Sequence, residues 1–313
     1  MTTTKTINGG TLTVIPKTEP YNEKQNYGAF AVIKSDGSVF AWGIGEEGGD
    51  ISSVASQLDG TIPVTQIFSN GEHFAALRSD GSVVTWGGWS SGSDRSDHSK
   101  NAYKYLNGDI DVTQIYSTYA AFAAIRADGS VISWGTTGRE YTGDYSGDYS
   151  TLWKLLEINT DEVLKQLDGS IPVTKIFTND GESSFAALRS DGSVVTWGNK
   201  YEGGDSSAVK DSLNGDIDII NVYSNDSAFA ALRSDGSVIS WGTAAGYMEI
   251  VGATSIDSAA VASQLSSGVK QIYPIIDWSN GGAFIAIKAD GSVFTWGAKD
   301  AADISSVVDQ LNG

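Results

Sequence analysis

One fourteen-residue stretch occurs six times in this chain and constrains the fold more than any other feature. FAALRSDGSVVTWG occupies residues 74–87 and again residues 185–198. Four variants complete the set: FAVIKSDGSVFAWG at 30–43, FAAIRADGSVISWG at 122–135, FAALRSDGSVISWG at 229–242 and FIAIKADGSVFTWG at 284–297. A catalytic site is assembled from unlike residues in named roles. Six near-copies therefore predict a structural unit, and we expect function where the copies differ.

Each copy places Asp-Gly between two apolar runs, which is the pattern of a β-hairpin. Glycine adopts positive φ at little cost, and aspartate tolerates the turn. We therefore expect FAALR and SVVTWG to form antiparallel strands. Their apolar residues do not alternate, which is typical of strands covered on both faces. The turn aspartates are Asp36, Asp80, Asp128, Asp191, Asp235 and Asp290.

A third strand is expected before most copies, and a short helical segment before that strand. The strands read IPVTQIF at 62–68, IDVTQIY at 110–116, IPVTKIF at 171–177 and IDIINVY at 217–223, with a weaker VKQIY at 269–273. The helical segments carry valine and leucine four residues apart, on one helix face. These pairs are Val54 with Leu58, Val163 with Leu167, Val209 with Leu213, Val261 with Leu265, and Val307 with Leu311. We expect each segment to cover the outer edge of its sheet, since an open edge invites aggregation.

The spacing of the repeats predicts one six-bladed β-propeller over residues 1–313. The turn aspartates lie 44 to 63 residues apart, and the longest gap is too short for a seventh copy. Repeats of roughly 40–50 residues are typical of propellers and solenoids. The chain ends at Leu311-Asn312-Gly313, where a next unit would begin its strand, and residues 8–14 resemble that strand. We expect the terminal segments to close the ring. We interpret six tryptophans as packing between blades: Trp42, Trp86, Trp134, Trp197, Trp241 and Trp296.

Charge and composition narrow the classes of partner. The net charge of −18 repels nucleic acid and anionic membranes, so we expect neither as a partner. A basic protein partner is one interpretation of this charge, and solubility is the other. The chain has no cysteine. We see neither a signal peptide nor an apolar run of about 18 residues, so we expect a cytoplasmic monomer or one exported by a route that needs no signal peptide.

The repeat resembles that of the regulator of chromosome condensation family of β-propellers. Residues 71–87, GEHFAALRSDGSVVTWG, match the family's His-x-x-Ala-Leu and Asp-Gly-x-Val-x-x-Trp-Gly elements. The family histidine is kept only at His73, and the usual Gly-Gln-Leu-Gly after Trp-Gly is replaced, for example by Glu202-Gly203-Gly204-Asp205. The resemblance implies roles such as nucleotide exchange on a small GTPase or inhibition of β-lactamases, but no residue of either role can be carried over. The Asp box of sialidase-type propellers has a different register.

Catalytic and cofactor motifs are scarce. The two histidines are His73, at a repeat position, and His98, in a polar run. Neither sits in a context that supports a Ser-His-Asp triad or a zinc site, so we expect no catalytic residue, metal or cofactor. A cation stands two residues before each turn aspartate, and we interpret it as a partner of the turn rather than as part of an anion site. These cations are Lys34, Arg78, Arg126, Arg189, Arg233 and Lys288.

The sequence departs most from the repeat pattern in the segments that connect some of the repeats. Residues 139–159, REYTGDYSGDYSTLWKLLEIN, form the most aromatic insertion. Tyrosine offers rigid amphipathic contact area and, with Asp, Ser and Gly, is typical of recognition loops. An ordinary packed insertion is the alternative. The candidate partner-binding residues are Tyr141, Asp144, Tyr145, Asp148, Tyr149, Trp153 and, in another divergent loop, Trp89.

Three functions remain open from the sequence. The first is a non-enzymatic scaffold that binds a protein, such as a bacterial adhesin, inhibitor or toxin-associated module, since short and nearly identical repeats have a bacterial character. The second is an exchange-factor-like effector that acts on a small GTPase. The third is a propeller hydrolase that uses carboxylates.

We predict six blades around one axis, with residues 11–15 adding a strand beside the opposite end of the chain. Six Asp-Gly hairpins and the split repeat are the reason. A crystal structure with seven blades, or with the termini on opposite sides, would contradict this prediction.

Overall fold

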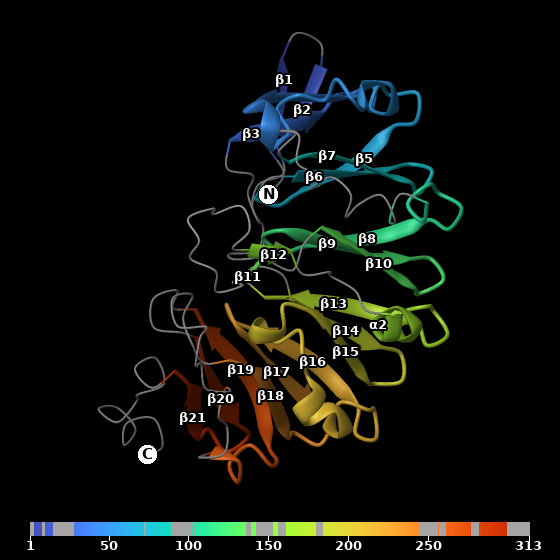
Figure 1. Ribbon diagram of the computed structural model, residues 1–313. Helices are drawn as coiled ribbons and strands as arrows, with labels where there is room; N and C mark the ends of the chain where they lie inside the picture. The colour runs from blue at the N-terminus through green and yellow to red at the C-terminus, as the bar shows by residue number, and fades with distance from the viewer. Residues whose placement is uncertain are drawn as a thin grey trace. The chain divides into compact units, whose positions relative to one another are not determined.

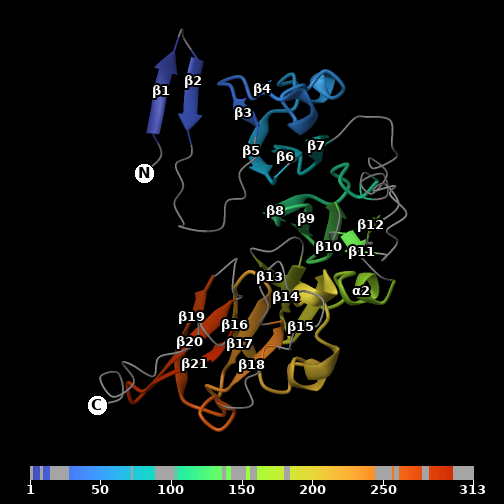
Figure 2. The ribbon, with the colours of Figure 1, turned by 60° about the vertical axis from the view of Figure 1, so that its left-hand side comes forward.

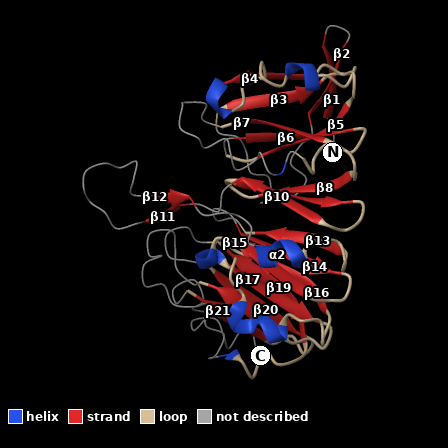
Figure 3. Cartoon of the chain, turned by 45° about the vertical axis from the view of Figure 1, so that its right-hand side comes forward, coloured by secondary structure: helices blue, strands red, loops and turns tan. Residues whose placement is uncertain are grey.

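Strands dominate the described part of the chain, and the helices are short (Figure 3). The computed structural model describes residues 3–7, 10–14, 28–71, 73–88, 102, 104–135, 139–141, 153–155, 161–179, 184–243, 256, 261–276 and 282–298. The chain forms two compact units, residues 1–136 and 137–313. The predicted all-β class is confirmed. Closure of the repeats into one ring, and hence one domain, stays a prediction.

Every Asp-Gly repeat forms the expected antiparallel hairpin. The turn glycines have positive φ, for example 77° at Gly192, which explains why glycine follows the aspartate. The hairpins are β3 (Ala29–Ile33) with β4 (Val39–Gly43), β6 (His73–Arg78) with β7 (Val83–Gly87), β9 (Ala121–Arg126) with β10 (Val131–Gly135), β14 (Ser184–Arg189) with β15 (Val194–Gly198), β17 (Ala228–Arg233) with β18 (Val238–Gly242), and β20 (Ala283–Lys288) with β21 (Val293–Gly297).

Five repeats add the predicted third strand, which makes five three-stranded antiparallel sheets. These strands are β5 (Val64–Ser69), β8 (Val112–Ser117), β13 (Val173–Thr178), β16 (Ile219–Ser224) and β19 (Val269–Ile275). The pairing of each with the central strand shifts after its first residue, as at a β-bulge. In residues 137–313 the three-stranded sheets follow one another in chain order (Figure 1).

The N-terminal residues form a hairpin of their own. β1 (Thr3–Ile7) pairs with β2 (Gly10–Val14) in an antiparallel two-stranded sheet (Figure 2). The strand predicted at residues 11–15 is thus present, and among the described residues its partner is β1. The first repeat has two described strands, β3 and β4.

The helical segments between sheets are mostly single 3-10 turns. They are η1 (Gly45–Glu47), η2 (Ala55–Gln57), α2 (Asp161–Gln166), η4 (Lys200–Glu202) and η5 (Ser207–Ser212). The predicted leucines are buried, with Leu58 1% and Leu213 2% exposed. The carbonyl of Leu58 accepts a hydrogen bond of 2.9 Å from the first amide of β4, at Val39. The leucine therefore anchors the segment to the edge of its sheet. Val307 and Leu311 lie outside the described residues.

Within each unit, backbone hydrogen bonds join one repeat to the next. The amide of Val64, which begins β5, donates to the turn carbonyl of Gly37 at 2.9 Å, and Ile219 donates to Gly192 at 3.0 Å. The Asp-Gly turn is therefore both the end of one hairpin and the docking point of the following strand.

A stacked phenylalanine and tryptophan stand opposite each other in every hairpin. Their ring centroids lie 5.1–5.4 Å apart across the six repeats. Five of the tryptophans are buried, among them Trp197 at 2% and Trp241 at 3% exposed. Stacked aromatic pairs contribute about 0.5–1.5 kcal/mol beyond their buried area. The expected packing role of the tryptophans agrees with this burial.

In two of these pairs, a glycine of the preceding repeat packs on the phenylalanine ring and accepts a hydrogen bond from the tryptophan. The indole Nε1 of Trp86 donates to the carbonyl of Gly48 at 3.0 Å, and that of Trp241 donates to Gly203 at 2.9 Å. Both glycines belong to Glu-Gly-Gly-Asp runs that follow the previous Trp-Gly. A Cβ on Gly203 would lie 2.6 Å from a ring carbon of Phe229, and its φ is +94°. Only glycine permits this approach.

The first repeat shows the same pair without such a cover. Phe30 is 61% and Trp42 is 44% exposed, although their rings stack at 5.4 Å. Burial of the pair therefore depends on a neighbouring repeat and not on the hairpin itself.

We predict that Trp197→Ala lowers the free energy of unfolding by about 3–5 kcal/mol, the usual cost of emptying a large buried aromatic site. Tyr273→Ala is the control, because it removes a large aromatic side chain that is 47% exposed and should cost clearly less. Urea unfolding of both variants measures the difference. Equal losses would show that burial by the neighbouring repeat does not set the stability.

Candidate protein-binding site

The aromatic insertion begins and ends in a short hairpin. β11 (Arg139–Tyr141) pairs with β12 (Trp153–Leu155), and the register places Tyr141 opposite Trp153 (Figure 3). The structure thus brings together two of the seven candidate partner-binding residues from the two ends of the insertion.

The remaining candidates lie outside the described residues. Asp144, Tyr145, Asp148 and Tyr149 belong to residues 142–152, which connect the two strands in sequence, and Trp89 belongs to another divergent segment. Backbone pairing at the base joins the two ends of the connecting segment. Restraining the ends of a loop before binding lowers the entropy cost of ordering it in a complex.

The repeat cations are used by their own turns in three repeats. Arg78 Nε donates to Ser82 Oγ at 2.6 Å, and Ser82 in turn donates to Asp80 Oδ1. Arg126 and Arg189 make the equivalent bonds at 2.7 Å. Each of these arginines also lies 3.8–3.9 Å from its turn aspartate. These arginines therefore have the turn-pairing role that we expected.

The turn aspartates are held in their charged form. A side-chain hydrogen bond from Ser237 and a backbone hydrogen bond from the same residue keep the pKa of Asp235 below its usual value. Hydrogen bonds from Ser38 and Ser292 lower the pKa of Asp36 and Asp290 in the same way. Burial raises the pKa of Asp191, but the hydrogen bonds of Ser193 and the charge of Arg189 outweigh it, so its pKa is also lowered. These carboxylates stabilise turns and are poorly suited to proton transfer near neutral pH.

His73 has a packing role rather than a catalytic geometry. Its backbone amide donates to Asn70 Oδ1 at 2.8 Å, and burial lowers the pKa of its ring. A Cβ on Gly88 would lie 2.3 Å from its Nε2, so the ring fills the space above this glycine. The described residues include no group of three acidic or histidine side chains placed to hold a metal ion. His98 lies outside the described residues.

A buried asparagine after the first strand is a structural feature that the sequence reasoning missed. Asn179 Nδ2 donates to the carbonyls of Glu202 and Asp226 at 3.0 and 3.2 Å, which links the end of β13 to the following sheet. Asn70 and Asn225 are buried at the same repeat position. Their recurrence directly after a strand, as in FSN, FTN and YSN, was the available signal.

No model of a known protein family matches the chain, and no curated protein matches it. Solved structures with some similarity include yeast RCC1 (Prp20) bound to Kap60, at 16% identity and a TM-score of 0.39, covering 88% of this chain and 69% of that chain. Human WBSCR16 has 14% sequence identity and a TM-score of 0.42, and the match covers 96% of this chain and 81% of that chain. The CRINKLY ectodomain of the Arabidopsis thaliana receptor kinase ACR4 has 13% identity and a TM-score of 0.37, and the match covers 87% of this chain and 77% of that chain. These TM-scores are too low to assign a fold or a function to this chain.

No helix among the described residues has the length and apolar character to cross a membrane.

We predict that acid weakens the protein through its turns. The folded pKa of Asp235 lies below the unfolded value of about 3.9, so its stabilisation is present at neutral pH and is lost as pH falls through the folded pKa. Ser237→Ala removes the hydrogen bond that lowers this pKa. The variant should be less stable at pH 7, yet lose less stability on acidification than the parent.

Urea unfolding at neutral pH and at about pH 3, below the unfolded pKa of Asp, measures this effect. Ser263→Ala is the control, because Ser263 Oγ donates to Gln264 and not to a carboxylate. Equal acid sensitivity of the parent and Ser237→Ala would contradict the prediction.

Proposed function

We propose that the chain is a non-enzymatic scaffold that binds another protein through the insertion at residues 139–155. The observation that carries the proposal is the β11–β12 hairpin, which holds Tyr141 opposite Trp153 at the base of the most aromatic divergent segment. The repeat residues are largely occupied by their turns and aromatic stacks, whereas the sequence of this insertion does not recur after the other five hairpins.

The composition of the insertion fits a protein surface. Tyrosine and tryptophan are enriched at binding hot spots because they bury large areas at a small entropy cost. Asp144 and Asp148, together with a net charge of −18, favour a basic partner, since opposite charges speed association and select the partner. The same charge disfavours nucleic acid and anionic membranes as partners.

The remaining features of the proposal follow from the sequence. We envisage a monomer whose six repeats close as a propeller, without catalytic residues, cofactor or metal. It would act in the cytoplasm or after export. The turn carboxylates support the non-enzymatic role, because their low pKa keeps them charged and their oxygens accept hydrogen bonds from serine.

We predict that Tyr145→Ala or Tyr149→Ala weakens partner binding by about 2 kcal/mol or more if either tyrosine is a hot spot, while the melting temperature hardly changes. The partner is first captured from host or neighbour lysates with the parent chain as bait. Calorimetric titration of the purified partner then gives the affinities. Tyr273→Ala is the control, since it removes a tyrosine that is 47% exposed on β19.

Deletion of residues 139–152 is the stronger test. Full binding by that variant would move the site elsewhere. Binding that is lost only when Arg78, Arg126, Arg189 and Arg233 are mutated together would instead favour a symmetric anionic ligand.

A further inference from the structure

The linker before the last repeat is two residues shorter than its counterparts. From the buried leucine to the first residue of the next strand, four linkers advance six positions, whereas Leu265 to Val269 advances four. The longer linkers run from Leu58 to Val64, Leu106 to Val112, Leu167 to Val173, and Leu213 to Ile219. The deletion leaves the docking bond intact, because Val269 N donates to Gly236 O at 2.9 Å.

In other linkers the residue directly before the strand lies over the preceding Asp-Gly turn, and in this linker that residue is Gly268. A Cβ on Gly37 would lie 2.5 Å from Pro63 Cβ, and one on Gly81 would lie 2.5 Å from Asp111 Cβ. At Gly236 the three nearest atoms are backbone atoms of Gly268 and Val269. The shortened linker therefore brings no side chain over this turn.

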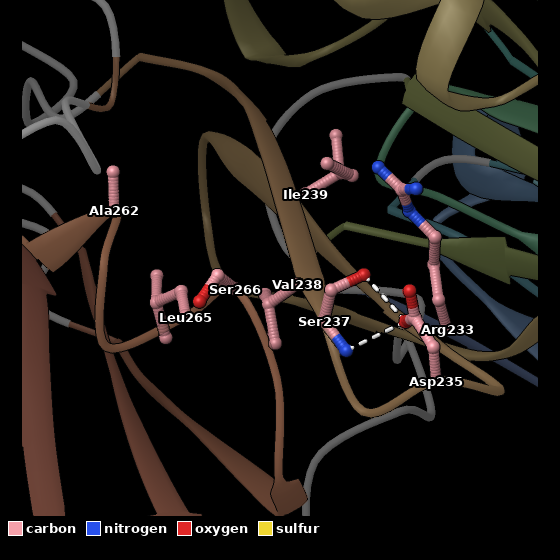
Figure 4. A pocket seen from close by; sticks show the side chains of 8 residues that line it. All are labelled: Arg233, Asp235, Ser237, Val238, Ile239, Ala262, Leu265 and Ser266. Atoms are coloured by element: carbon pink, nitrogen blue, oxygen red, sulfur yellow. Dashed lines mark hydrogen bonds between the residues drawn. The ribbon is translucent and has the colours of Figure 1, made fainter.

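A pocket of about 400 Å³ lies beside the uncovered turn (Figure 4). One wall consists of Leu265, Ser266 and Ala262 from the linker. The lining is completed by Arg233, Asp235, Ser237, Val238 and Ile239 from the β17–β18 hairpin. The pocket thus combines one guanidinium with several apolar side chains, which is the usual composition of a small-molecule site.

Arg233 differs from its counterparts although its local sequence is the same. Arg78, Arg189 and Arg233 all stand in Leu-Arg-Ser-Asp-Gly-Ser. The first two donate from Nε to the turn serine. Arg233 Nε is buried without a hydrogen-bond partner among the described residues. Figure 4 shows its guanidinium extending away from the Asp235 carboxylate, which is joined to Ser237.

A second cation stands near the shortened linker. Lys288 Nζ donates to the carbonyl of Gln264 at 3.1 Å, next to Leu265 of the pocket wall. The charge of Lys288 is offset by its own turn aspartate, Asp290, and that of Arg233 by Asp235. A monoanion is repelled by Asp235 less strongly than a dianion would be.

We propose that this pocket binds a small organic carboxylate that carries an apolar group. A planar guanidinium pairs with a carboxylate through two parallel hydrogen bonds, and the guanidinium that lines this pocket is that of Arg233. The half-buried Ile239 and the exposed Ala262 offer surface for the apolar group. A free apolar amino acid and the C-terminal residue of a peptide share this chemistry. They differ at the nitrogen, where a free ammonium could pair with Asp235.

Isothermal titration of the full chain tests the proposal with four probes: N-acetyl-L-leucine, L-leucine, L-leucinamide and inorganic phosphate. We expect N-acetyl-L-leucine to bind and leucinamide, which lacks the carboxylate, not to bind. Tighter binding of leucine than of N-acetyl-L-leucine identifies a free amino acid as the ligand class, and the reverse order identifies a peptide C-terminus. Phosphate that binds more tightly than either carboxylate would overturn the assignment.

Arg233→Gln should weaken carboxylate binding about tenfold or more, the effect of losing one charged hydrogen bond. Arg189→Gln is the matched control, since it has the same flanking residues but a guanidinium already bonded to its turn, and it should bind like the parent. Inserting Ile-Asp before Val269 restores the usual linker length and the aspartate that precedes the strand at Asp111 and Asp218, and it should abolish binding with Arg233 still present. Parent-like affinity of Arg233→Gln, or of the insertion variant, in chains that melt cooperatively would overturn the proposal, as would absence of carboxylate binding by the parent.

Discussion

The stack of phenylalanine on tryptophan is the interaction on which the repeat architecture depends. Each hairpin provides the pair, but the hairpin alone does not bury it, as Phe30 and Trp42 of the first repeat show. Where a preceding repeat offers Gly48 or Gly203, the glycine backbone closes over the phenylalanine ring and its carbonyl accepts the indole N–H. Stability in such an array is a sum of weak units and strong interfaces between neighbours. Single repeats of this chain would therefore not be expected to fold alone.

The same dependence explains three unusual indoles. Trp134, Trp197 and Trp296 are buried, yet their Nε1 atoms have no hydrogen-bond partner among the described residues. Each follows a repeat whose Glu-Gly-Gly-Asp run has been replaced by a divergent segment. A buried donor without an acceptor costs about 1–3 kcal/mol. In sequence, the divergent segments thus replace the run whose glycine carbonyl accepts from Trp86 and Trp241.

Local chemistry made the hairpins, the third strands and the buried leucines predictable from the sequence. Asp-Gly specifies a turn through its own backbone, and the valine–leucine spacing marks one face of a short segment. Arg233 could not be predicted in this way, because its six-residue neighbourhood is identical to that of Arg189. Its different environment comes from a linker more than twenty-five residues away in the sequence. The pairing of β2 with β1, by contrast, has a local signal that our reading of the sequence missed, because residues 8–9 between the two strands are Asn-Gly.

Both candidate binding sites arise where the repeat is interrupted, and they use opposite ends of the hairpin. The aromatic insertion follows a Trp-Gly end, after Gly135, whereas the carboxylate pocket lies at an Asp-Gly turn, next to Gly236. Near-identical repeats present near-identical surfaces, so an insertion or a deletion is the simplest way to create one unique site among six. Because Arg233 and Tyr145 belong to different interruptions, a variant of either should leave the other site intact. Loss of both activities in one variant would then indicate that the fold, and not a site, has been damaged.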